Sequence, residues 1–261
     1  MVVELSAIVA ERGRRLAKTI KDPAEAAAEL ERLFGEATSA VFFGGAGVST
    51  ASGIPDFRSP SGLYHQRGYK YPPETMLSHG FYETHREEFF DFYRNVMCAP
   101  DAKPNQCHLK LAELEREGRL LSVVTQNIDG LHQAAGSRRV WELHGSTHRN
   151  VCQRCGRVFS QEWVLATSGE PRCDACGGPV KPDVVLYEES LDQSVIEGAV
   201  RDIASCDLLV VGGTSLVVYP AAGLIDYFRG DKLVICNLEP TSGDARADVV
   251  CACDIAKAFD F

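Results

Sequence analysis

The sequence has no apolar run that approaches the roughly 18 residues a helix needs to cross a bilayer. Residues 1–22, MVVELSAIVAERGRRLAKTIKD, mix charged with apolar side chains and show no small-residue cleavage site behind a hydrophobic core. They therefore do not resemble a secretory signal. We expect no membrane association and a cytoplasmic location.

Excess positive charge is also missing. The 261 residues include 27 Lys and Arg against 36 Asp and Glu, and the net charge is −9. A nucleic-acid partner requires clustered basic residues, so we expect no direct nucleic-acid binding. Internal repeats and low-complexity tails are absent. Apolar content of 45% and charged content of 24% are typical of a globular protein with ample core.

A disulfide framework is not indicated, although the chain has ten cysteines. Six are scattered singly, at positions 98, 107, 206, 236, 251 and 253, which without an export signal indicates buried free thiols in a reducing compartment. The other four form two CxxC pairs with seventeen residues between them: Cys152, Cys155, Cys173 and Cys176. Four thiolates at this spacing predict one tetrahedral zinc ion. Its closed ligand shell leaves no position for water, so the zinc is expected to be structural.

Short apolar runs alternate with helical patterns along most of the chain. Strands are expected at 40–43, 120–127, 140–146, 183–189, 207–218 and 232–240. Helices are expected at 3–20, 23–36, 103–120, near 192–204 and near 219–229, and the aromatic spacing of residues 81–97 predicts a further helical segment. This alternation predicts an α/β fold with a doubly wound, Rossmann-like parallel sheet.

The first of these strands is followed at once by a glycine turn. Gly44, Gly45 and Gly47 allow a close approach to a ligand, and Ser49 or Thr50 is expected to open a helix whose amino end accepts a pyrophosphate. Gly53 and Pro55 interrupt that helix after little more than one turn, unlike the ordinary dinucleotide-binding turn. The chain is then expected to form a loop that carries Asp56, Phe57 and Arg58 over the bound ligand.

This stretch, GAGVSTASGIPDFR, resembles the cofactor-binding signature of the sirtuins, the NAD-dependent protein deacylases, and the resemblance is to their bacterial type. It recurs in order over most of residues 40–241, at TQNIDGLH (125–132), ELHGS (142–146), CQRCG and CDACGG (152–178), KPDVVLYEE (181–189), GGTSLVVYPAAGL (212–224) and NLEPT (237–241). The resemblance implies a single catalytic domain. Its Rossmann-like NAD-binding part would comprise 1–59, 101–150 and 180–261, with a helical insertion at 60–100 and a zinc module at 151–179.

The resemblance also implies that NAD is the cosubstrate. Main-chain amides of the glycine-containing turns would hold the phosphates, Glu239 would accept hydrogen bonds from the adenosine ribose, and the main chain of Cys253 would meet the adenine. The implied cofactor-binding residues are Gly45, Ala46, Gly47, Ser49, Asp56, Phe57, Arg58, Gln126, Asn127, Ile128, Asp129, Gly213, Thr214, Ser215, Asn237, Glu239 and Cys253. For Asp56, a loop-capping carboxylate is nearly as good an interpretation.

Three residues carry the implied catalytic roles. Asn127 would hold the ribose hydroxyls, and Asp129 with Ile128 would hold the nicotinamide amide. The acyl-lysine carbonyl oxygen would attack the ribose carbon that bears nicotinamide, and an alkylimidate would form. His144, as general base, would activate the ribose hydroxyl that attacks the imidate. Lysine and O-acyl-ADP-ribose would result, while Phe57 covers the reactive carbon against water.

An acylated-lysine protein or peptide would enter as an extended strand between the zinc module and the sheet, pairing near 185–189 and 214–218. Val185 would accept the acyl-lysine amide hydrogen, and Tyr187 and Glu188 stand where most sirtuins have phenylalanine and glycine. We expect Glu188 to favour basic residues around the target lysine. Tyr93 is followed three residues later by Val96 rather than by the arginine of succinyl-preferring sirtuins. We therefore expect acetyl or longer apolar acyl groups.

Three other functions fit parts of this pattern. Protein ADP-ribosylation would use the same displacement of nicotinamide with a different acceptor. A non-catalytic NAD-binding sensor would need neither His144 nor Asp129. A hydride-transferring oxidoreductase would fit the glycine turn but not the helix break at Pro55. The sequence leaves the oligomeric state and the physiological substrates open.

Overall fold

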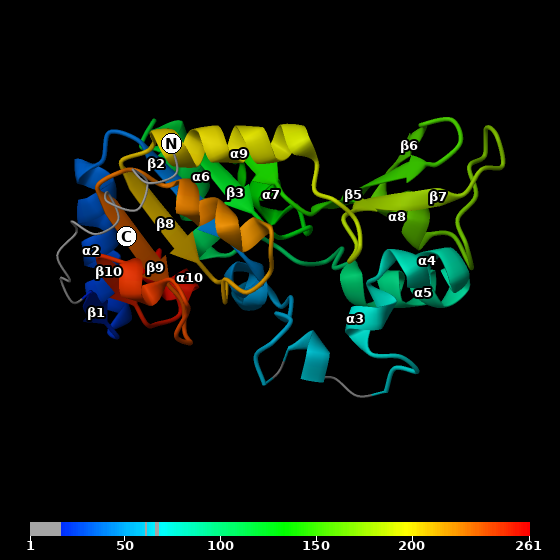
Figure 1. Ribbon diagram of the computed structural model, residues 1–261, viewed down its shortest axis with the longest axis horizontal. Coiled ribbons are helices and arrows are strands. Elements are labelled where there is room, and N and C mark those ends of the chain that lie inside the picture. The colour runs from blue at the N-terminus through cyan, green and yellow to red at the C-terminus, as the bar shows by residue number, and fades with distance from the viewer. Residues whose placement is uncertain (1–16, 61, 66–67) are drawn as a thin grey trace, which may run out of the picture.

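The structure is a computed structural model that describes residues 17–60, 62–65 and 68–261. It has two lobes, which lie side by side in Figure 1. The large lobe is built on a seven-stranded sheet, and the small lobe combines a three-stranded sheet with short helices. The predicted helix at 3–20 lies mostly outside the described residues. Its last part is wrong, because Lys18–Ile20 form an edge strand, β1.

Every strand pair in the large sheet is parallel, as predicted. The strand order is β1 (Lys18–Ile20), β10 (Val249–Cys251), β9 (Lys232–Cys236), β8 (Leu208–Gly212), β2 (Ala40–Gly44), β3 (Leu120–Thr125) and β4 (Val140–Glu142). From β2 the chain adds β3 and β4 on one side, and it later returns to add β8, β9 and β10 on the other. The order therefore reverses between β2 and β8, which is where ligands of such sheets bind.

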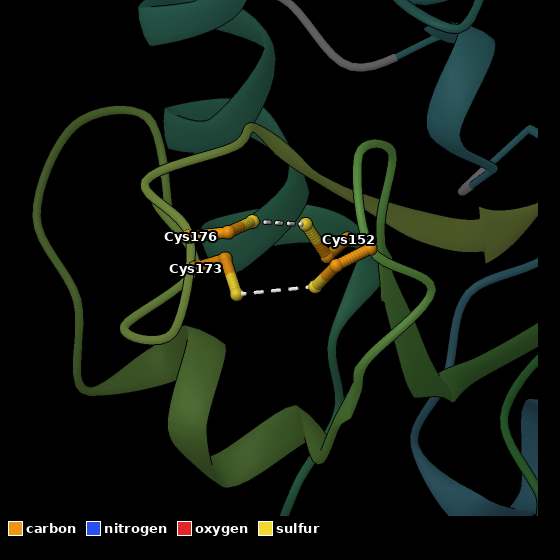
Figure 2. A group of neighbouring side chains, drawn as sticks. Cys152, Cys173 and Cys176 are labelled. Carbon is orange, nitrogen blue, oxygen red and sulfur yellow. Dashed lines mark hydrogen bonds between the residues drawn. The ribbon is translucent and has the colours of Figure 1, made fainter.

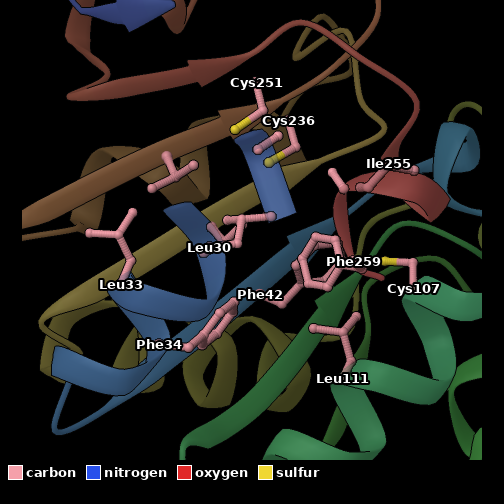
Figure 3. Close-up of a cluster of buried hydrophobic side chains, with 14 of the residues drawn as sticks. Leu30, Leu33, Phe34, Phe42, Cys107, Leu111, Cys236, Cys251, Ile255 and Phe259 are labelled. Atoms are coloured by element: carbon pink, nitrogen blue, oxygen red, sulfur yellow. The ribbon is translucent and has the colours of Figure 1, made fainter. Parts of the chain in front are cut away.

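Hydrophobic layers cover both faces of the large sheet. One layer comes from α2 (Pro23–Glu36), α6 (Gln106–Arg116) and α10 (Ile255–Ala258), and the other from α9 (Gln193–Ser205) and the 3₁₀ helix η4 (Ala221–Tyr227). Along β2, Ala40 and Phe42 point into the first layer, and Val41 and Phe43 into the second. Figure 3 shows Phe42 in the first layer. Each buried side chain of this size contributes about 1.5–3 kcal/mol.

Local signals explain where the helices of the large lobe begin. Asp22 accepts a hydrogen bond from the amide of Glu25, and Pro23 occupies the first turn of α2. The helix predicted at 103–120 starts three residues later, at Gln106, because Asn105 is its N-cap. The short helices α7 (Leu131–Ala135) and η5 (Asp244–Arg246) complete this lobe.

The small lobe contains the antiparallel sheet of β6 (Val158–Phe159), β5 (Gly145–Cys152) and β7 (Val180–Val184), together with α8 (Gln161–Leu165). The strand expected at 183–189 in the parallel sheet was wrong, because β7 ends at Val184 and pairs with β5 instead. An apolar run alone does not distinguish parallel from antiparallel partners.

Short helices pack beside this sheet: η2 (Leu63–His65), α3 (Pro73–Met76), α4 (His79–Thr84), α5 (Arg86–Phe92) and the π-helical turn η3 (Tyr93–Met97). Their aromatic residues form the core of the small lobe: Phe81, Tyr82, Phe89, Phe90, Phe92 and Tyr93. Arg94 joins this segment to the end of α8 and the loop after it, by donating to the Val164 carbonyl at 3.1 Å and to the Thr167 hydroxyl at 2.8 Å. Within the described residues, no helix has the length and apolar character to span a membrane.

Candidate active site

The glycine turn lies where the order of the large sheet reverses. Gly44 is in register with Thr125 on β3 and with Gly212 on β8, so the loops after these three strands leave the same edge together. The amide of Gly47 donates to the Gly213 carbonyl at 2.8 Å. A Cβ atom on Gly47 would lie 2.8 Å from the Gly213 Cα, and Gly213 itself has a φ of +59°. These glycines thus permit two ligand-facing turns to touch.

The helix after this turn differs from the expectation in type and start. It is a 3₁₀ helix, η1 (Ala46–Ser52), that begins before Ser49, and Gly53 ends it in the left-handed conformation. The early end is as predicted. Asn105 holds η1 from the side, because its amide nitrogen donates to the Val48 carbonyl at 2.8 Å and to the Ser52 hydroxyl at 2.9 Å.

Ser49 joins the two side chains expected to bind ribose and nicotinamide. Its hydroxyl donates to the Asp129 carboxylate at 2.6 Å and accepts from the Asn127 side-chain amide at 3.0 Å. The second Asp129 oxygen accepts from the amide of Leu131 at 2.9 Å. Because Ser49 and Asn127 are buried, these bonds fix the two side chains rigidly in place.

His144 follows β4 and precedes β5, at the junction of the lobes. Its Nδ1 atom lies 2.9 Å from the Gln126 carbonyl oxygen. A carbonyl oxygen only accepts, so Nδ1 donates and the neutral ring keeps a lone pair on Nε2. Burial lowers the pKa of His144 and outweighs the opposing effect of the Gln126 bond. The ring is therefore neutral near pH 7, which is the state a general base requires. Gly145 must lack a Cβ, since that atom would lie 1.9 Å from the Asp183 carbonyl oxygen.

The loop after η1 is fixed by its own contacts. One Asp56 carboxylate oxygen accepts from the amides of Arg58 and Ser59 at 3.0 and 2.8 Å, so Asp56 caps this loop. The ring of Phe57 is 5.5 Å from that of Tyr64, edge to face, and both pack against the core of the small lobe, as does Ile128. The Arg58 guanidinium lies 5.4 Å from the Tyr64 ring centroid.

The loop after β8 faces the one after β3. Gln126 donates from its side chain to the Thr214 hydroxyl at 3.1 Å, and its main-chain amide donates to the Gly44 carbonyl at 2.9 Å. Ser215 is half-buried next to Thr214. Ala46 and Gly45 lie opposite, on the β2 side, where the Gly45 amide donates to the Gly212 carbonyl at 3.1 Å.

The four paired cysteines converge in the small lobe. Their sulfur atoms all lie within 4.8 Å of one another, with 3.5 Å between Cys152 and Cys176 and 3.7 Å between Cys155 and Cys173. Figure 2 shows these sulfurs pointing toward one another. A tetrahedral zinc–thiolate site has Zn–S bonds of about 2.3 Å, which places its sulfurs about 3.8 Å apart. The arrangement therefore fits one zinc ion bound by four cysteines.

Known proteins that are similar to this chain in sequence and fold identify its family. The model of the family described as "Sir2 family" matches residues 45–220. A protein of Clostridium acetobutylicum named NAD-dependent protein deacetylase is 56% identical over 234 residues, which is 89% of this chain and 96% of that protein. One of the same name from Cutibacterium acnes is 55% identical over 223 residues, covering 85% and 91%. This chain belongs to the Sir2 family.

Solved Sir2 structures agree. One, described as Sir2 with a deacetylated p53 peptide and 3'-O-acetyl ADP ribose, has a TM-score of 0.81 at 39% identity and covers 89% of this chain and 95% of that one. Another, of Sir2 bound to acetylated peptide, has a TM-score of 0.78 at 38% identity, covering 89% and 94%. The α/β fold, the sirtuin resemblance and the NAD-dependent chemistry inferred from the sequence are thus confirmed.

In this Sir2 protein, the residues expected to bind adenosine follow β9 and β10. Asn237 follows β9 and donates from its side chain to the Glu239 carbonyl at 2.7 Å, while the Glu239 side chain is exposed. Cys253 is buried in the first hydrophobic layer, and burial raises the pKa of its thiol to about 11. Any contact of Cys253 with adenine would have to come from its main chain.

The segment after β7 differs from the sequence expectation. Val185 donates its amide to the His144 carbonyl at 3.0 Å. Both main-chain groups of Tyr187 are used within the chain: its amide donates to the Leu77 carbonyl at 2.9 Å, and its carbonyl accepts from the His79 amide at 3.0 Å. The Tyr187 amide is thus already used within the chain, and main-chain pairing of a substrate near 185–189 stays a prediction. Glu188 adopts a φ of +78°, which explains why glycine is usual at this position in sirtuins.

Sequence reasoning missed two buried histidines near Asp129. His108 and His132 are buried with their rings 4.7 Å apart, and the Asp129 carboxylate exerts an electrostatic effect on His108. Burial lowers the pKa of His108 to about 4 and that of His132 well below its usual value. The only sequence signal was the presence of His132 in the TQNIDGLH motif.

Proposed function

We propose that this chain is an NAD-dependent protein-lysine deacetylase that converts NAD, acetyl-lysine and one water molecule to nicotinamide, O-acetyl-ADP-ribose and lysine. The observation that carries the proposal is the orientation of His144, with Nδ1 bound to the Gln126 carbonyl and Nε2 left to take a proton. Sir2 relatives named NAD-dependent protein deacetylase at 56% and 55% identity give the reaction.

Each group of the site has a place in this reaction. NAD lies as a substrate along the edge formed by the loops after β2, β3 and β8. The Ser49–Asp129 pair holds the nicotinamide amide, and Asn127 holds the ribose hydroxyls beside it. When nicotinamide departs, the acyl oxygen bonds to the ribose carbon that carried it. His144 then takes the proton of the ribose hydroxyl that attacks the imidate, and Phe57 excludes bulk water.

The zinc ion belongs to the framework of the small lobe. The four sulfurs fill its coordination shell, so no position is left for a catalytic water. Bound zinc would tie the CxxC turn after β5 to the one before β7 and so fix the lobe that faces the NAD edge.

A direct experiment is to incubate the protein with NAD and acetyl, succinyl and myristoyl peptides and to weigh the products. We expect O-acetyl-ADP-ribose and nicotinamide in equal amounts, with little succinyl turnover because Val96 stands where an arginine would bind the carboxylate. A His144→Ala variant should form far less O-acetyl-ADP-ribose, because it loses the base that activates the ribose hydroxyl after nicotinamide has departed. Protein that carries covalently bound ADP-ribose, formed without O-acetyl-ADP-ribose, would indicate that the enzyme is an ADP-ribosyltransferase. NAD binding without nicotinamide release would indicate a non-catalytic sensor.

The substrate preference follows from Glu188. Its carboxylate accepts from the Gly80 amide at 2.9 Å at the start of α4, yet the residue remains exposed, so its charge is accessible to a peptide that binds beside it. We infer a preference for basic residues near the target lysine. On a peptide array, Glu188→Gln and Glu188→Gly should both weaken this preference. An unchanged array profile would refute it.

A cytoplasmic location completes the proposal. None of the ten cysteines forms a disulfide in the structure, as is usual in a reducing compartment. The protein would be freshly extracted in the presence of a chelator and denatured, and its thiols would then be titrated. We expect ten reactive thiols per chain. A lower count from disulfides would contradict this location.

A further inference from the structure

A hydrogen bond between two tyrosine side chains joins the cofactor loop to the substrate segment. The hydroxyls of Tyr64 and Tyr187 lie 2.6 Å apart, although 123 positions separate them in the sequence. Tyr64 belongs to η2, directly after the loop that carries Phe57 and Arg58. Tyr187 belongs to the segment after β7 that borders His144. We call these two residues the tyrosine pair.

Tyr64 is tied closely to the residues proposed to cover NAD. Its amide donates to the Phe57 carbonyl at 2.9 Å, its ring packs edge to face on the Phe57 ring, and the Arg58 guanidinium lies over its face. A displacement of Tyr64 therefore displaces Phe57 and Arg58 as well. Burial and the bond to Tyr187 raise the pKa of the Tyr64 phenol, so its hydroxyl stays protonated near neutral pH.

Tyr187, by contrast, is held in a rigid setting. Its main chain is clamped between Leu77 and His79, and Glu188 is bonded to the start of α4. The Glu189 carboxylate accepts from the Leu186 amide at 2.9 Å and from Lys181 at 3.0 Å. The backbone of this segment cannot yield when a peptide packs against it. The Tyr187 side chain is 41% exposed, so it is accessible to such a peptide.

From this geometry we propose that the tyrosine pair makes NAD binding depend on the acyl-peptide. A peptide that packs on the Tyr187 ring holds its hydroxyl against Tyr64 and so fixes Phe57 and Arg58 where NAD needs them. Tyr187 and Tyr64 are thus positioning residues, and the hydroxyl of Tyr187 is a feature that the usual phenylalanine lacks. Thermodynamic reciprocity requires that NAD strengthen peptide binding by the same factor. This inference rests on the proposed function for the identity of the two ligands.

The test measures coupling by calorimetry, with ADP-ribose as an unreactive substitute for NAD. Its Kd is determined without peptide and with a saturating acetyl-lysine peptide, and the ratio is the coupling factor. We expect a factor above one for the wild type. Tyr64→Phe and Tyr187→Phe should each lower it by about 2- to 10-fold, the usual range for one hydrogen bond. The double variant should lose no more than either single variant, because both remove the same bond.

A matched control is Tyr227→Phe, which removes a hydroxyl from a half-exposed tyrosine on η4 in the large lobe. It should leave the coupling factor unchanged, and thermal unfolding should show that all variants fold alike. In turnover, the pair variants should raise the KM for NAD more than they lower kcat.

Several results would overturn the proposal: a wild-type coupling factor of one, an unchanged factor in both single variants, additive losses in the double variant, or an equal loss in Tyr227→Phe. Failure of the proposed function would look different. In that case no O-acetyl-ADP-ribose would form with the wild type, whatever the binding measurements show, and coupling that depends on the two hydroxyls would still support the inference.

Discussion

The Nδ1 atom of His144 lies 2.9 Å from the main-chain carbonyl oxygen of Gln126. This one bond selects the tautomer, directs Nε2 away from the β3 loop and links the general base to a residue whose side chain contacts Thr214. The pH dependence of the reaction follows from it.

We expect log kcat/KM to rise with pH through an acid limb whose midpoint lies below 6.5. Protonated His144 cannot act as a base, and burial lowers its pKa, so activity persists to lower pH than an exposed histidine would allow. The measurement is kcat/KM for an acetyl peptide from pH 4.5 to 8. A limb centred above pH 7 would contradict the assignment. His144→Ala should reduce the rate by about 10²- to 10⁴-fold.

Ser49→Ala should reduce kcat/KM for NAD by about 10- to 100-fold, because the Asp129 carboxylate loses a charge-assisted hydrogen bond and Asn127 loses its support. Steady-state assays at varied NAD would measure this, alongside nicotinamide exchange. The control is Thr50→Ala, because the exposed hydroxyl of Thr50 donates to the neighbouring Gly47 carbonyl. Equal losses in the two variants would argue against the Ser49–Asp129 pair.

From the zinc site we expect elemental analysis to find one metal ion per chain. Chelation should lower the unfolding temperature and abolish activity, since the turns after β5 and before β7 lose their common anchor. Cys173→Ser should lose the metal, whereas Cys98→Ala, a buried cysteine outside the cluster, should keep it. Stoichiometric zinc in Cys173→Ser would show that the four sulfurs do not form the site.

Stability should fall as the pH decreases from about 6.5 toward 4. In that window His108 becomes protonated in the unfolded chain. In the folded chain it stays neutral, because burial lowers the pKa of His108 to about 4. The loss is about 1.4 kcal/mol per pH unit for one such group. In urea unfolding, the free energy of unfolding should differ less between pH 7 and pH 5.5 for His108→Gln than for the wild type. The side-chain amide oxygen of the glutamine can still accept from the Asn105 amide. An identical pH effect in the variant would refute this origin.

Much of the fold could be predicted because its signals are local. Apolar runs such as Ala40–Gly44 mark buried parallel strands, and the two CxxC pairs specify a metal cluster by spacing alone. The short strands β1 and β10, of three residues each, carry too few residues for a pattern. The antiparallel partner of β7 is β5, about thirty positions earlier in the chain. The apolar character of β7 does not indicate which strand it will pair with.

The same distinction applies to the site. Motif residues such as Asn127 and Asp129 lie two positions apart in the sequence, so their grouping was predictable, although their individual contacts with NAD remain predictions. The bonds that orient them are not local: Ser49 reaches Asp129 across 80 positions, and Tyr64 reaches Tyr187 across 123. Such contacts depend on how the chain folds, which a single sequence does not reveal.

The alternation of Val41 and Phe43 with Ala40 and Phe42 ties the core to the cofactor turn. Deleting one residue ahead of Gly45 would exchange the two hydrophobic faces of the central strand, or else pull the turn out of line with Gly213. Neither change can be absorbed locally. The length of β2 is therefore constrained twice, once by packing and once by catalysis, and insertions should be tolerated far better in the loop after α8 than here.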